Sequence, residues 1–169
     1  MGLRNRSLLT EERCFFVTTT CHQHLSIPSD SICFSILFDS FLFYNEKYKA
    51  KLLAYVFLNN HIHFIIYFQE ETRLIDYMRD FKKFTSLKLR EHIVTAKPDQ
   101  LWRIEHEKRT QHFKVWEDRY DDVYLYLRNI CETKIDYIHS NPSDYPYSSA
   151  AFYEGKREKS QLMHYREVF

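Results

Sequence analysis

Two adjoining apolar segments, residues 51–58 and 61–68, constrain the fold of this 169-residue chain more than any other feature. Both segments are rich in β-branched and aromatic side chains, which favour strands, and Asn59-Asn60 between them suits a tight turn. Since both segments are apolar on both faces, we expect a hairpin at the centre of an antiparallel sheet.

Helical and extended patterns interleave around this hairpin. Apolar residues at intervals of three and four indicate helices, whereas β-branched runs indicate strands. Together they predict an α+β fold, an antiparallel sheet with helices packed on it, in one domain over residues 1–169. The expected elements are a strand at 13–20, a helix capped by Ser29 or Asp30 that ends near Tyr48, a helix from Thr72 to about Ile93, a short strand at 112–116, and a helix from Asn129, where Asn129-x-x-Glu132 has the form of a capping box, to near Asn141.

The composition excludes several classes of protein. Two glycines, where average usage gives about twelve, leave no G-x-G-x-x-G dinucleotide fingerprint and no Walker-type phosphate loop. A net charge of +1 means that only local basic patches argue for nucleic acid. The longest apolar run, 54–68, is interrupted by polar residues and is shorter than the ~20 residues of a membrane helix, so we expect no membrane partner. The four cysteines lack metal-site spacing and no secretory signal is seen, so we expect buried, reduced thiols in a cytoplasmic protein.

The second expected helix combines an apolar stripe with basic residues. The stripe predicted to face the sheet consists of Leu74, Met78, Phe81, Phe84 and Leu87. The basic residues are candidate contacts to a nucleic-acid backbone, although they also fit a solvated helix face. They are Lys82, Lys83, Lys88 and Arg90.

The sequence His61-Ile62-His63 is the first candidate for a chemical site. Side chains alternate along a strand, so both imidazoles project from one face while Ile62 points to the other. Two neutral imidazoles about 6–7 Å apart along a strand can share a divalent ion. A packed, hydrogen-bonded pair is the alternative. His22 and His24 have the same spacing but lie in an expected loop, where solvated side chains are the simpler interpretation.

The last expected helix carries the second candidate. At about 100° per residue, Lys134, Tyr137 and Asn141 lie together at one edge of an apolar arc that faces the sheet. From this edge a tyrosine and an amide can reach a metal held on the sheet. Packing remains the alternative role for one tyrosine among 13.

Four blocks of sequence, in order, resemble the HUH single-tyrosine transposases of the REP-associated or insertion-sequence type. The segment 58–66 resembles their Met-Pro-Asn-His-hydrophobic-His segment, and 136–149 resembles Tyr-Ile-x-x-Asn-Pro followed by Tyr-x-x-Ser-Ser. Between them, 81–86 is similar to Phe-Lys-x-Phe-Thr and 115–116 to Ile/Val-Trp. The similarity spans residues 13 to 153.

This resemblance implies a ferredoxin-like HUH nuclease fold and metal-dependent cleavage of single-stranded DNA. His61 and His63 would bind Mg²⁺ or Mn²⁺ with Asn141 as the third ligand, and Tyr137 would attack the scissile phosphate. The product would be a 5′-phosphotyrosine link and a free 3′-OH, which permits strand transfer as well as cleavage. The implied partner is single-stranded DNA with a hairpin, bound by a monomer or a homodimer.

The chain also departs from the family's pattern. Asn59 stands where the family has proline, Val123 and Tyr126 stand where it often has histidine and arginine, and the stretch after Asn141-Pro142 is short. These departures concern substrate contacts more than the nuclease core. The alternative function is a catalytically inactive, domesticated module that binds hairpin DNA or RNA on the same scaffold. A metal-binding regulatory domain is a third interpretation, but it gives Tyr137 no role.

Overall fold

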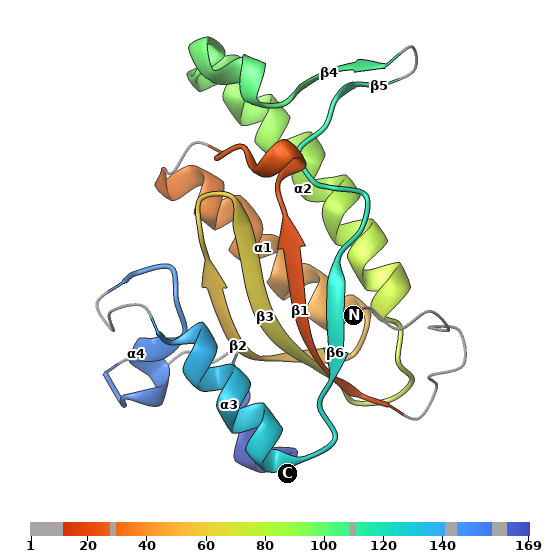
Figure 1. Ribbon diagram of the computed structural model, residues 1–169, viewed down its shortest axis with the longest axis vertical. Coiled ribbons are helices and arrows are strands. Elements are labelled where there is room, and N and C mark those ends of the chain that lie inside the picture. Colours follow the sequence, from red (N-terminus) through yellow and green to blue (C-terminus); the bar gives the residue numbers. More distant parts are fainter. Residues whose placement is uncertain (1–11, 28–29, 109–110, 141–144, 157–161) are drawn as a thin grey trace.

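The computed structural model describes residues 12–27, 30–108, 111–140, 145–156 and 162–169. Four antiparallel strands form the central sheet in the order β2-β3-β1-β6 (Figure 1). Their bounds are β1 Cys14–Thr20, β2 Ala50–Phe57, β3 His61–Phe68 and β6 Asp121–Tyr124.

The expected β2–β3 hairpin is confirmed, but of its two strands only β3 lies in the interior of the sheet. β3 lies between β2 and β1, whereas β2 is an edge strand. β2 is nevertheless buried on both faces, because a helix packs on each face, and its outer edge is covered through bridges from Val56 to Ser148 and from Leu52 to Leu162. β6 was not expected from the sequence, since its four residues include two aspartates.

The connection of the elements confirms the ferredoxin-like arrangement. The order β1, α1 (Ser31–Lys47), β2, β3, α2 (Leu74–Ala96), β6 is a split β-α-β pattern in which β1 lies between β3 and β6. α1 and α2 cover one face of the sheet, while α3 (Arg128–Ile138) and α4 (Ala150–Tyr153) lie on the other (Figure 1).

Two hydrophobic clusters occupy the two faces, because neighbouring residues of a strand point to opposite sides. Phe15, Val17 and Phe64 belong to the cluster under α1 and α2, whereas Phe16 and Ile65 belong to the cluster under α3. His63 is in step with Ile65 along β3 and therefore lies on the α3 face.

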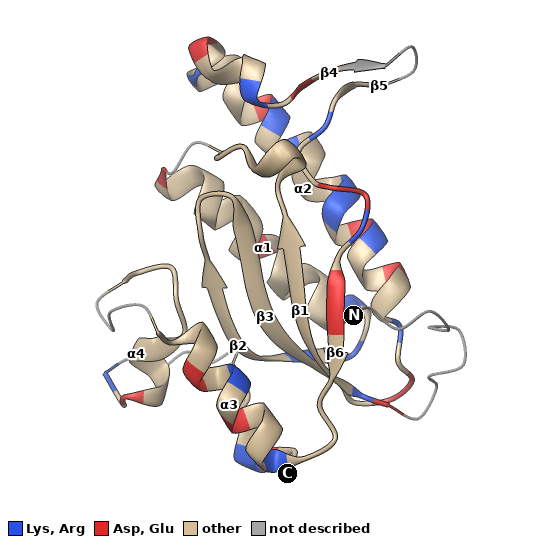
Figure 2. Ribbon diagram, viewed as in Figure 1, with Lys and Arg blue, Asp and Glu red and all other residues tan. Residues whose placement is uncertain are grey.

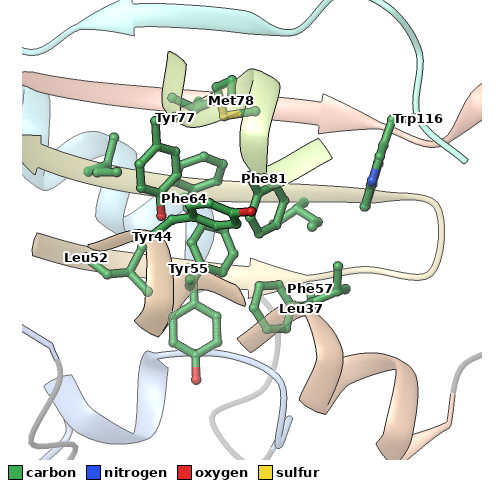
Figure 3. Close-up of a cluster of buried hydrophobic side chains, with 14 of the residues drawn as sticks. Leu37, Tyr44, Leu52, Tyr55, Phe57, Phe64, Tyr77, Met78, Phe81 and Trp116 are labelled. Carbon is green, nitrogen blue, oxygen red and sulfur yellow. The ribbon is translucent and has the colours of Figure 1, made fainter. Parts of the chain in front are cut away.

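Aromatic side chains dominate the cluster under α1 and α2 (Figure 3). The ring of Phe81 lies 4.6 Å from that of Phe41 and 6.4 Å from that of Trp116, centroid to centroid. The indole N–H of Trp116 donates a hydrogen bond to the hydroxyl of Thr85 at 2.9 Å, so the buried polar end of the ring is satisfied.

The apolar stripe predicted on α2 is correct in its first half and wrong in its second. Phe81 is buried, but Phe84 and Leu87 are 41% and 49% exposed, and Thr85 and Leu89 are buried instead. Each step of three residues falls about 60° short of a full turn, so the series 81, 84, 87 rotates off the buried face, whereas steps of four stay closer to it.

The expected helix starts have mixed outcomes. Asp30 caps α1, with its Oδ1 accepting from the N–H of Cys33 at 2.8 Å. The expected start at Thr72 is two residues early, because α2 begins at Leu74 after Arg73, and the hydroxyl of Thr72 donates to the carbonyl of Glu12. The capping box at Asn129 is wrong, since α3 begins at Arg128 and the carboxylate of Glu132 is bound by the side chains of Arg128 and Tyr165.

The remaining elements are short. The expected strand at 112–116 is found in part as β5, which pairs with β4 in a separate two-stranded sheet. The four cysteines are buried and unpaired, as expected. In the described part of the chain, no helix has the length and apolar character needed to cross a membrane. The short elements are η2 (His22–His24), η3 (Pro98–Arg103), β4 (Glu105–Lys108), β5 (Gln111–Phe113) and η4 (Tyr165–Glu167).

Candidate metal and tyrosine site

The histidine pair lies at the start of β3, on the face of the sheet that α3 covers. The rings of His61 and His63 are 4.7 Å apart, centroid to centroid, and nearly perpendicular. His63 is buried with 8% of its surface exposed, whereas His61 is half-buried. The alternation predicted for the two side chains is therefore observed.

Both rings are held through the same nitrogen. Nδ1 of His61 lies 2.7 Å from Oδ1 of Asn60, and Nδ1 of His63 lies 2.8 Å from the hydroxyl of Thr18. Because an amide oxygen only accepts, Nδ1 of His61 carries the proton and Nε2 keeps its lone pair. Hydrogen bonding at Nδ1 with a free Nε2 is typical of histidines that bind metals.

The surroundings keep the pair neutral. Burial, helped by the nearby charges of His61 and Lys134, lowers the pKa of His63 to about 4. Burial and the neighbouring His24 also lower the pKa of His61. Neutral imidazole is the form that binds a metal ion, so the donor set fits a divalent cation such as Mn²⁺.

Tyr137 lies next to the histidine pair. Its ring centroid is 5.2 Å from that of His63, and the two rings meet edge to face. Phe16 of β1 stacks on His63 at 5.5 Å and contacts Tyr137 at 6.0 Å. Tyr137 is 55% exposed, so one side of its ring packs on the site while a substrate can still reach it.

The end of α3 is fastened to β2 by a buried serine. Nε2 of His139 lies 2.7 Å from the hydroxyl of Ser149, and the same oxygen accepts from the N–H of Tyr55 at 2.9 Å. The backbone N–H of Ser149 donates to the carbonyl of Tyr55, and that of Phe57 donates to the carbonyl of Tyr147. The Ser-Ser segment thus runs along the edge of β2 and fixes the helix end that carries Tyr137.

The basic residues predicted to bind DNA are not part of this site, because α2 lies on the opposite face of the sheet. The ammonium of Lys82 donates to the carbonyls of Glu117 and Arg119, both at 2.9 Å, and so ties α2 to the segment before β6. The other three are at the surface or nearly so: Lys83 is exposed, Lys88 pairs with Glu91, and Arg90 covers the ring of Phe113.

Two further candidates from the sequence have different outcomes. Asn141 lies outside the described residues, so its place relative to the histidines stays a prediction. His22 is not a solvated loop residue, because Nδ1 lies 3.1 Å from a carboxylate oxygen of Glu117 and the ring packs on His106. His24 is exposed as expected, with its backbone in the left-handed region at φ 55°.

Sequence patterns did not single out several residues that shape the site. Phe16 and Thr18 lie on the same face of β1, as the alternation of side chains along a strand predicts. The pairing of Thr18 with His63, however, depends on the register between two strands that are far apart in the chain. Ser149 belongs to a segment noted for its resemblance, although its contact with His139 follows only from the folded chain.

A ferredoxin-like sheet that carries a histidine pair beside a tyrosine on a covering helix is the arrangement expected from the resemblance to single-tyrosine transposases. Residues 35–141 match the sequence model of the family described as Transposase IS200 like, and the chain belongs to this family. A comparison with curated proteins gives no match.

Two solved structures have a similar fold. One is a REP-associated tyrosine transposase bound to a REP hairpin, which has 17% identity and a TM-score of 0.66 and covers 97% of this chain and 98% of its own. The other is a putative transposase from Deinococcus radiodurans, with 11% identity, a TM-score of 0.50 and coverage of 76% and 90%. At these identities the similarity shows the fold alone.

Proposed function

We propose that this protein is a metal-dependent endonuclease and strand transferase for single-stranded DNA, with Tyr137 as the nucleophile. The contact between the rings of Tyr137 and His63, 5.2 Å apart, carries the proposal. Tyr137 is half-exposed beside two imidazoles that are hydrogen-bonded through Nδ1 and whose Nε2 atoms have no partner among the described residues, an arrangement that suits metal binding and chemistry better than packing alone.

In the proposed reaction the phenolic oxygen of Tyr137 bonds to the scissile phosphorus, and the bond between phosphorus and the 3′ oxygen breaks. The phenol loses its proton, and the departing 3′ oxygen gains one to give a free 3′-OH and a 5′-phosphotyrosine link. Since one phosphate ester replaces another, a 3′-OH can reverse the step and join strands.

The chain's own residues would hold and orient the reacting groups. His61 and His63 hold the cation through Nε2, with Asn141 as the proposed third ligand, while Asn60 and Thr18 fix the two rings. When bound, Mg²⁺ or Mn²⁺ supplies a Lewis acid at a phosphate oxygen.

The proposed substrate is single-stranded DNA next to a hairpin. A solved structure with the same fold is bound to a REP hairpin, which supports this partner. Lys83, Lys88 and Arg90 are proposed contacts to the DNA backbone, and because α2 lies on the opposite face they would bind DNA away from the cleaved phosphate. We also propose that residues 1–169 form one domain, as a monomer or a homodimer.

Covalent capture tests the proposal. A labelled single-stranded oligonucleotide with a hairpin is incubated with the protein and Mn²⁺, and a denaturing gel is used to detect an adduct. We expect an adduct that chelator prevents and that Tyr137→Phe abolishes while DNA binding persists. Tyr124→Phe is the matched control, because Tyr124 packs against the cluster under α1 and α2, on the face of the sheet opposite the histidines.

Each outcome has a definite meaning. If Tyr137→Phe still forms the adduct, Tyr137 is not the nucleophile. If the wild-type protein binds the oligonucleotide tightly but forms no adduct over a range of hairpin sequences, the inactive binding module is the better description. If it neither binds DNA nor forms an adduct, both functions are wrong.

A further inference from the structure

Lys134 is the cation nearest to Tyr137 and His63 whose contacts the structure describes. Its ammonium nitrogen lies 4.7 Å from the ring centroid of Phe16 and 5.9 Å from that of Tyr137. Its charge also reaches His63, since it helps to lower the pKa of that residue. Lys134 is half-buried, so its alkyl stem packs over Phe16 and its charged end lies at the site.

No carboxylate neutralises this ammonium within the described part of the chain. Glu132 is bound to Arg128 at 3.0 Å and to the hydroxyl of Tyr165 at 2.7 Å. Asp136 lies on the same helix, and its negative charge raises the pKa of His139. A cation held by two aromatic rings and left without an anion is arranged for an anionic ligand.

The side chains that contact Lys134 add no negative charge, and Asp121, on the same face of the sheet, is exposed and paired with Thr18 across β1 and β6. Both histidines are neutral, and Phe16 and Thr18 carry none. α3 displays acidic and basic residues, whereas the strands β1, β2 and β3 are almost free of charge (Figure 2). Within the described residues, an incoming phosphate therefore meets an ammonium that is not bound to a carboxylate, while the exposed Asp121 lies on the edge strand β6.

We propose that Lys134 binds a non-bridging oxygen of the phosphate that Tyr137 attacks. This inference rests on the proposed function and adds a residue to it. Negative charge grows on these oxygens as the phenolic oxygen approaches phosphorus, so a fixed ammonium binds the transition state more tightly than the ground state. The spacing of three residues places Lys134 one helical turn from Tyr137, on the same side of α3.

A comparison of three variants separates this role from packing. Lys134→Met keeps the stem on Phe16 and removes the charge, Lys134→Arg keeps the charge, and Lys51→Met removes an exposed lysine at the opposite end of the sheet. At saturating hairpin oligonucleotide, we expect Lys134→Met to lower the rate of adduct formation by about tenfold to a hundredfold. Lys134→Arg should recover part of the loss, and Lys51→Met should leave the rate unchanged.

A binding measurement keeps the inference independent of catalysis. In the Tyr137→Phe protein, we measure Kd for the hairpin oligonucleotide at several NaCl concentrations, with and without Lys134→Met. One lost phosphate contact to a single strand lowers the slope of log Kd against log salt by about 0.7. A reduced slope without any adduct in the wild-type protein would support the phosphate contact and reject the proposed catalysis.

The opposite results overturn the inference. If the adduct forms at the same rate in Lys134→Met and the salt slope is unchanged, Lys134 does not contact the phosphate. If Lys134→Arg is as slow as Lys134→Met while both have the wild-type melting temperature, the charge is not what matters. If no DNA binds to any variant, the inference fails together with the proposed function.

Discussion

The hydroxyl of Thr18 lies 2.8 Å from Nδ1 of His63, and the two residues are direct partners across β1 and β3. The orientation of the buried imidazole is therefore set by the register of the sheet. A shift of the pairing by one residue would place Thr19, whose side chain points to the other face, opposite His63. Strand pairing and the proposed metal site depend on the same contact.

Thr18→Val should weaken metal binding without unfolding the protein. The substitution removes the partner of Nδ1 in His63, and the loss of such outer contacts commonly reduces metal affinity about 10–100-fold. Titration calorimetry with Mn²⁺ measures the effect. Thr19→Val is the control, because within the described chain the buried hydroxyl of Thr19 has no hydrogen-bond partner. Equal affinities of the two variants would exclude a role for Thr18.

Ser149→Ala should destabilise the protein by about 1–3 kcal/mol. The hydroxyl of Ser149 is buried and contacts both His139 and the N–H of Tyr55, so its removal leaves polar groups without partners. Urea denaturation measures the free energy of unfolding. Ser140→Ala, at an exposed position just after α3, should change it by less than about 0.5 kcal/mol. If Ser149→Ala lowers the free energy of unfolding no more than Ser140→Ala does, the contact with His139 does not hold the end of α3.

The free energy of unfolding should fall as the pH is lowered from 7 to 5. Burial lowers the pKa of His139 to about 4 in the folded state, against the opposing charges of Asp136 and Glu154. The unfolded chain, with an ordinary histidine pKa near 6.5, binds the proton first, so stability present above pH 6.5 is lost as the pH falls toward 4. His63 shifts in the same direction.

Replacing His139 by glutamine should remove part of this pH dependence. Denaturation at pH 7 and pH 5 should show a fall smaller by about 1–2 kcal/mol in His139→Gln than in the wild-type protein. His112→Gln, at an exposed position, is the control and should keep the full fall. Equal falls in all three proteins would contradict the burial of a neutral His139.

Two leucines on α2 should differ sharply in their cost when truncated. Leu89 is fully buried, so Leu89→Ala should cost about 2–5 kcal/mol through lost burial and a cavity. Leu87 is 49% exposed, and Leu87→Ala should cost about 0.5 kcal/mol or less. Thermal and chemical denaturation measure both values. If the two variants lost similar free energies of unfolding, Leu87 would belong to the buried face of α2, as the sequence predicted.

Lys82 and Lys83 are adjacent but should act in different ways. Lys82→Met removes the hydrogen bonds to the carbonyls of Glu117 and Arg119 and should destabilise the fold by about 1–3 kcal/mol, with no change in the salt slope of DNA binding. Lys83→Met should keep stability and weaken DNA binding. A reversal of these two effects, measured by denaturation and by fluorescence anisotropy, would contradict the assignments.

Several elements could be predicted from the sequence because their signals are local. The hairpin of β2 and β3, the cap of α1 at Asp30 and the placement of His61 and His63 on one face all follow from turn chemistry, capping and alternation between neighbours in the chain. The edge of α3 that carries Lys134 and Tyr137 follows in the same way from helical periodicity.

Contacts between distant segments depend on how the whole chain folds and could not be predicted from local signals. Thr18 is hydrogen-bonded to His63, Ser149 to His139, and Lys82 to a backbone carbonyl in the segment before β6. These contacts follow from strand order and register, which the packing of the whole sheet sets. The second half of α2 shows the same dependence: its buried face is the one that meets α1 and Trp116, and spacing in the sequence alone did not identify it.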